Sequence, residues 1–60
     1  MNESAKRRLI EMAYAHPTKA VANYKALVEL AQRIAEADSV MLKLDADSVE
    51  QAVKNIFGAV

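Results

Sequence analysis

The stretch from Thr18 to Asp38 carries an apolar face that is too wide for one neighbouring helix to cover. At about 100° per residue, its polar side chains fall in one narrow sector: Lys25, Glu29, Gln32, Arg33 and Glu36. The apolar side chains spread over roughly half of the circumference, well beyond the ~100° stripe of an ordinary surface helix: Val21, Tyr24, Leu27, Val28, Leu30, Ala31, Ile34 and Ala35. We therefore expect this helix to be covered from two sides, in part by a second copy of the chain.

Self-association is also expected because a chain of 60 residues has few other sources of stability. A domain of this size buries only about 60% of its unfolded surface and usually needs a disulfide, a metal or a partner. The sequence has no cysteine and a single histidine, His16, so neither a disulfide nor a metal site of several imidazoles is expected. We predict a homodimer that meets through Leu27, Leu30 and Ile34, with no metal and no cofactor.

The composition favours helices and gives no sign of a charged binding surface. One glycine and one proline in 60 residues argue against a turn-rich β-protein, and 53% of the residues are hydrophobic, many of them alanine. Eight basic and eight acidic side chains balance to a net charge of zero, whereas dedicated nucleic-acid binders carry an excess of Lys and Arg. No stretch approaches the ~20 apolar residues of a membrane span, and residues 1–8 are not followed by the apolar run of a secretory leader. We expect a cytoplasmic protein without membrane contact.

We predict an all-α fold, a single helical domain over residues 1–60. Its three helices are expected at about residues 3–15, 19–37 and 48–57. The middle helix, at roughly 28 Å, forms the spine on which the other two pack. It contains neither glycine nor proline, so nothing in the residue types predicts a break.

The corner between the first two helices has clear local signals. Asn2 or Ser4 can cap the first helix, whose inner face is predicted to comprise Ala5, Leu9, Met12 and Ala13. Pro17 ends it, because the residue before a proline is displaced from the α region. Thr18 is the expected N-cap of the second helix.

The last helix has the clearest start signal in the chain. Asp47 is the expected N-cap, and the segment from Asp47 to Glu50 is similar to a capping box in which Glu50 reaches back. Gly58 is the expected glycine after the helix end. One face of this helix is apolar, at helical spacing: Val49, Ala52, Val53, Ile56 and Phe57.

Residues 39–45 allow three interpretations. Val40, Leu42 and Leu44 alternate with Met41 and Lys43, which is strand periodicity over five residues. The favoured interpretation is an extended connector, since a lone strand is not stable without a partner edge. The others are a helix that continues to Met41 or Leu42, and a strand that pairs with its twin in a dimer.

The candidate nucleic-acid contacts are the bases at the start of the first helix and two lysines of the second. They are Lys6, Arg7, Arg8, Lys19 and Lys25. Such side chains bind phosphates, but three successive helical positions span ~200°, so the first three do not form one stripe, and Glu3 and Glu11 flank them. A solvated helix surface is the favoured interpretation of this cluster.

No residue cluster indicates catalysis, and we expect no enzyme. The chain has no cysteine, His16 at a helix end before proline favours a structural role, and so few residues leave little room for a pocket of ~300 Å³. The leading function is a small non-enzymatic interaction or regulatory module, such as an adaptor, inhibitor or assembly factor of phage-like type. The alternative is a small dimeric DNA-binding regulator that uses the basic start of the first helix.

Overall fold

Residues 2–58 fold as four helices joined by short turns. The structure is a computed structural model that describes residues 2–58; the expected domain of residues 1–60 includes a few terminal residues outside this range. The helices are α1 (Glu3–Ala15), α2 (Pro17–Ala22), α3 (Tyr24–Ser39) and α4 (Ala46–Phe57). Residues 2–58 contain no strand, so the predicted all-α fold is confirmed. The paired-strand interpretation of residues 39–45 is wrong because Val40 and Met41 lie in a turn, with Met41 at φ +57°.

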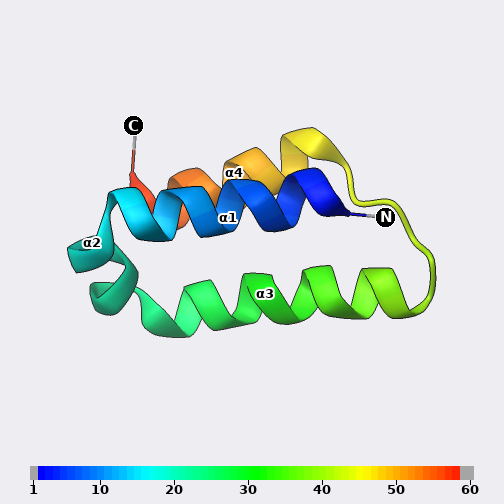
Figure 1. Ribbon diagram of the computed structural model, residues 1–60, viewed down its shortest axis with the longest axis horizontal. Coiled ribbons are helices and arrows are strands. Elements are labelled where there is room, and N and C mark those ends of the chain that lie inside the picture. The colour runs from blue at the N-terminus through cyan, green and yellow to red at the C-terminus, as the bar shows by residue number, and fades with distance from the viewer. Residues whose placement is uncertain (1, 59–60) are drawn as a thin grey trace.

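The three longer helices lie side by side, with their turns at the two ends. Figure 1 shows α1 and α4 running in the same direction and α3 running back against them. The short α2 closes one end of the molecule, and the connector from α3 to α4 closes the other. Each of the longer helices therefore has two neighbours, and the core lies between all three.

The predicted helix over residues 19–37 is divided at Asn23. Asn23 lies between α2 and α3 with φ −116° and ψ 35°, and its side-chain amide donates to the carbonyl oxygen of Ile56 at 2.9 Å. Asparagine is a weak helix former because its side chain competes for backbone hydrogen bonds. The prediction of an unbroken helix was wrong because this partner lies far along the chain, in α4.

Pro17 both ends α1 and begins α2. α1 stops at Ala15 as predicted, but Pro17 takes the first position of α2, where its missing N–H costs nothing. His16 is the N-cap residue, in place of the predicted Thr18. The ring of His16 lies 6.2 Å from that of Phe57, which supports the structural role expected of this histidine.

The core is apolar and draws on every helix. Val53 and Phe57 of α4 are fully buried, and burial of such side chains stabilises a fold by about 1.5–3 kcal/mol each. Around them lie the predicted inner face of α1 and the buried side of α3; the buried cluster comprises Ala5, Leu9, Met12, Ala20, Leu30, Ile34, Val49, Val53, Ile56 and Phe57. The predicted inner faces of the first and last helices are confirmed.

The N-cap of α4 is Asp45. Its Oδ2 accepts a hydrogen bond from the Ser48 amide at 3.1 Å, which satisfies one of the free donors of the first turn. The predicted cap, Asp47, lies inside the first turn, and Glu50 binds Arg8. The predicted helix start was therefore two residues late. Either aspartate could accept a hydrogen bond from the backbone amide three positions further along the chain, and the sequence pattern does not distinguish the two.

The C-terminus of α4 is held by α2. The ammonium of Lys19 donates to the carbonyl oxygen of Phe57 at 2.8 Å, next to the bond from Asn23 to Ile56. A cation and an amide donor at this end satisfy carbonyls that have no partner within the helix. Gly58 follows with φ +80°, a conformation that favours glycine, so the predicted helix end is confirmed.

α3 ends in a left-handed turn at Met41. The amide of Leu42 donates to the Ala37 carbonyl at 2.8 Å, and that of Met41 donates to the Asp38 carbonyl at 3.2 Å, the two bonds of a Schellman motif. Met41 has φ +57°, which costs a side-chain-bearing residue roughly 1 kcal/mol. Residues 42–45 then form the connector without regular structure, as the favoured interpretation predicted.

The assignment of the α4 cap gives a direct stability test. Asp45→Ala removes the acceptor for the Ser48 amide and is expected to lower the free energy of unfolding by about 0.5–2 kcal/mol. Asp47→Ala only removes a negative charge from the first turn, which is worth about 0.3–1 kcal/mol. Urea denaturation followed by circular dichroism measures both variants. A larger loss from Asp47→Ala would contradict the assignment.

Candidate functional site

The side chains predicted to meet a second copy are largely taken up by the core of the single chain. Leu30 and Ile34 are 3% and 2% exposed, and Leu27 is half-buried against the core. The prediction that these side chains are available to a partner is therefore corrected. The physical reason is α4, whose apolar face lies against the side of α3 that the first helix alone was expected to leave uncovered.

The other half of the wide apolar surface remains exposed, beside α1. On α3 it forms a stripe at i, i+4, i+7 and i+11 spacing, in which Tyr24, Ala31 and Ala35 are exposed and Val28 is half-buried. On α1 it includes Ile10 and Tyr14. We call these six residues the α1–α3 face. Ile10, Tyr14 and Tyr24 are 56%, 84% and 66% exposed.

An ion pair between the two helices shows that the two parts of this face are neighbours. The Lys6 ammonium contacts the Asp38 carboxylate, which identifies the edges of α1 and α3 that lie against each other. Ile10 stands one helical turn beyond Lys6, and Ala31 and Ala35 share the edge of Asp38. Ile10 and the stripe on α3 therefore lie on the same side of this contact, and Tyr14 lies about one further turn along α1 from Ile10.

The five candidate nucleic-acid contacts do not form one basic surface. Lys6 binds Asp38, Arg8 binds Glu50, and Lys19 donates to the Phe57 carbonyl. Arg7 and Lys25 are exposed, and neither makes an ion pair within residues 2–58. Three of the five cations thus have structural partners, which the sequence pattern alone did not indicate.

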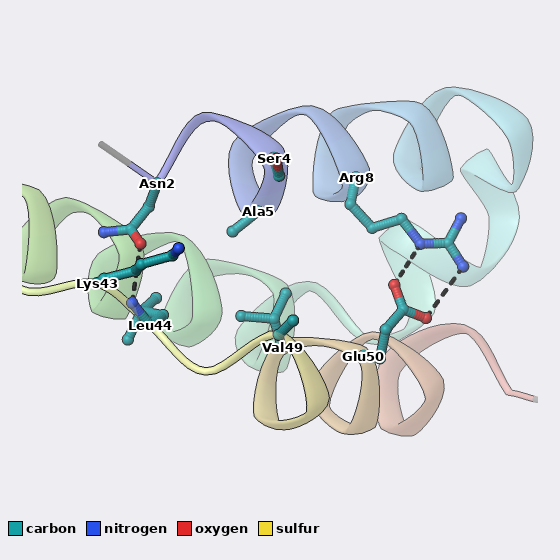
Figure 2. Close-up of a pocket in the computed structure, with 9 residues that line it drawn as sticks. Asn2, Ser4, Ala5, Arg8, Lys43, Leu44, Val49 and Glu50 are labelled. Carbon is teal, nitrogen blue, oxygen red and sulfur yellow. Dashed lines mark hydrogen bonds and ion pairs between the residues drawn. The ribbon is translucent and has the colours of Figure 1, made fainter.

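A groove of about 450 Å³ lies between α1, α4 and the connector. Figure 2 shows its two ends: Asn2 bound to Leu44 at one, and Arg8 bound to Glu50 at the other. Ala5, Leu44 and Val49 supply apolar surface between them. The volume lies in the range of small-molecule sites, but the polar groups at both ends already bind each other.

The geometry of the Arg8–Glu50 pair favours an ionised Glu50 over a role for this residue in acid–base chemistry. The guanidinium Nε lies 2.7 Å from Oε1, and a second nitrogen lies 3.3 Å from Oε2. The hydrogen bonds from Arg8 lower the pKa of Glu50. A general acid that works near neutral pH needs a shift in the opposite direction, so this carboxylate contributes an ion pair across the groove.

Asn2 is a buried polar residue whose role the sequence did not reveal. It is 5% exposed, and its side-chain amide donates to Asp38 Oδ1 and to the Leu42 carbonyl, both at 2.9 Å. The Leu44 amide donates back to Asn2 Oδ1 at 2.9 Å. Expected to cap α1, Asn2 makes no side-chain cap bond and instead joins the chain start to α3 and the connector.

Asp38 is the charged centre of this network. Its Oδ1 accepts from both the backbone amide and the side chain of Asn2, and its Oδ2 faces the Lys6 ammonium. The hydrogen bonds from Lys6 and Asn2 lower the pKa of Asp38 to about 2. The Asp38 carboxylate is therefore charged at neutral and at mildly acidic pH.

Comparison of the chain with protein-family models, with curated proteins and with solved structures gives no match. Within residues 2–58, no helix combines the length and the apolar character that a bilayer crossing requires. The same residues bring together no group of three His, Asp or Glu side chains that could hold a metal ion. The function must therefore be argued from the surfaces themselves.

The network around Asp38 predicts a pH-dependent contribution to stability. Because the folded-state pKa of about 2 lies below the ordinary value of 3.8, the contribution is full above about pH 5 and is lost as the pH falls towards 2. Asp38→Asn should therefore be clearly less stable than the natural chain at pH 6, and the gap should close in acid. Urea titrations at several pH values measure this gap.

The control for this experiment is Glu29→Gln, which removes an exposed charge away from the network. Its difference from the natural chain should change much less between pH 6 and pH 2. A gap for Asp38→Asn that stays constant over the whole range would show that the carboxylate is not held by Lys6 and Asn2.

Proposed function

We propose that this chain is a small non-enzymatic protein-interaction module that docks a protein chain on the α1–α3 face. The single observation that carries the proposal is the exposure of Ile10, Tyr14 and Tyr24 on one seam, at 56%, 84% and 66%. Aromatic side chains that present an apolar ring and a polar tip are enriched in protein interfaces. Contiguous exposed apolar surface of this kind marks interaction sites on small soluble domains.

The shape and chemistry of the face suit a helix or another flat protein surface. Ala31 and Ala35 allow close approach of a partner backbone, while Tyr14 and Tyr24 supply rigid, larger contacts, the residue type that tends to dominate binding energy. The Lys6–Asp38 ion pair lies at one end of the face, and Lys25 and Glu36 flank the α3 stripe on the side away from α1. This distribution, an apolar centre with a polar rim, is that of a protein interface.

Self-association remains part of this proposal, now assigned to the α1–α3 face in place of Leu27, Leu30 and Ile34. A domain of this size gains stability from a partner, and the exposed stripe on α3 is an apolar surface still available to one. Adaptors, inhibitors and assembly factors all act through such a face, so we keep these roles together as the proposed class of function.

The proposal predicts position-specific photo-crosslinking. A benzophenone amino acid placed at Tyr14 or Tyr24 should crosslink to a second copy in the purified chain, or to a partner protein in cells that produce the chain. Gln51 and Asn55, which are exposed on α4, provide matched control positions. Crosslinks that are equally abundant from all four positions, or absent from Tyr14 and Tyr24 in both settings, would contradict the proposal.

A further inference from the structure

We propose that two copies of this chain pair along α3, antiparallel to each other and crossing near residue 30. This inference rests on the proposed function, because it names the occupant of the α1–α3 face. The stripe Tyr24, Val28, Ala31 and Ala35 is symmetric in spacing about a point between residues 29 and 30, so the mirror position of Tyr24 is Ala35 and that of Val28 is Ala31. An antiparallel partner therefore places each larger side chain of one copy opposite an alanine of the other.

The charges beside the stripe match this arrangement. Lys25 and Glu36 lie on the edge of the stripe that points away from α1, one near each end of α3, and both are exposed. The midpoint between them falls between Leu30 and Ala31, within one residue of the proposed crossing. A two-fold axis at this point brings Lys25 of each copy opposite Glu36 of the other, so that two ion pairs form across the interface.

The parallel orientation does not pair these two charges. In a parallel two-fold pair, the edge of the stripe that carries Lys25 and Glu36 lies across from the opposite edge of the partner's stripe, so Lys25 of one copy does not meet Glu36 of the other. Charge complementarity thus selects the antiparallel orientation and fixes its register. An unrelated partner would need its own matching charges, whereas a second copy carries them already.

Neither charge makes an ion pair within residues 2–58. Lys25 and Glu36 are 11 positions apart, about 16 Å along the helix axis, too far to bind each other. Lys19, Arg8 and Lys6, by contrast, all have partners inside the chain. The pair that flanks the stripe is therefore free to act between molecules.

The test is charge reversal with rescue, read by sedimentation equilibrium. Lys25→Glu places like charges opposite each other in both copies and should weaken the dimer roughly five- to thirty-fold. Lys25→Glu combined with Glu36→Lys restores opposite charges and should return the dissociation constant to within about threefold of the natural value. Lys43→Glu makes the same charge change in the connector and should leave self-association nearly unchanged.

The helix itself should tolerate these substitutions. Glutamate in the first turn of α3 and lysine near its C-terminus both suit the helix dipole, and circular dichroism should show undiminished helix in each variant. Loss of the dimer therefore cannot be ascribed to unfolding.

The outcomes separate this inference from the proposed function. A natural chain that dimerises but responds equally to Lys25→Glu and Lys43→Glu, or that is not rescued by the double variant, would overturn the antiparallel register and leave the docking face intact. A natural chain that is monomeric at high micromolar concentration would overturn the second copy as occupant. In that case, crosslinks from Tyr14 and Tyr24 to another protein would still support the proposed function. The absence of any crosslink would contradict both the proposed function and the pairing of two copies.

Discussion

The packing of α4 between α1 and α3 is the interaction on which the rest of the structure depends. Val53 and Phe57 are fully buried, and they cover the side of α3 that carries Leu30 and Ile34. The end of α4 then presents free carbonyls, which Lys19 and Asn23 satisfy. The position of α2, the bend at Asn23 and the direction of α3 all follow from this contact, because each brings a donor or an apolar side chain to the end of α4.

The opposite end of the molecule is held by polar groups. Asn2, Lys6 and Asp38 join the start of α1 to the end of α3, and the turn at Met41 directs the connector back to α4. With both ends fixed, α1 and α3 are held side by side over their whole length. Their outer seam is therefore a preformed surface, which reduces the entropy that a partner must overcome on binding.

The sequence predicted the fold class and most of the core because those depend on local spacing. The apolar faces of the first and last helices and the end of α1 before Pro17 are set by residues within a few positions of one another. The bend at Asn23, the partners of Lys19 and Arg8 and the role of Asn2 depend on contacts more than 30 positions away. No local pattern encodes these contacts, and for that reason the sequence analysis missed them.

The width of the apolar surface on the middle helix was the most useful signal, although its two halves were assigned the wrong way round. Leu30 and Ile34 were predicted to contact a second copy, whereas they are buried in the core against the chain's own α4. The stripe from Tyr24 to Ala35 stays largely exposed. The periodicity of one helix shows how wide its apolar surface is, but which part of that surface the chain's own helices cover depends on how they pack.

Disulfide trapping tests most directly whether a second copy covers this stripe. The natural chain has no cysteine, so Ala31→Cys introduces a single thiol close to the proposed two-fold axis, and a disulfide needs Cα atoms within about 7 Å. Under mild oxidation this variant should form a linked dimer quickly. Ala26→Cys on the far side of α3 should not, and Ala35→Cys should be slow because antiparallel pairing separates its two thiols by roughly 15 Å along the axis. Equal rates for all three variants, or fastest linkage through Ala26→Cys, would contradict the account.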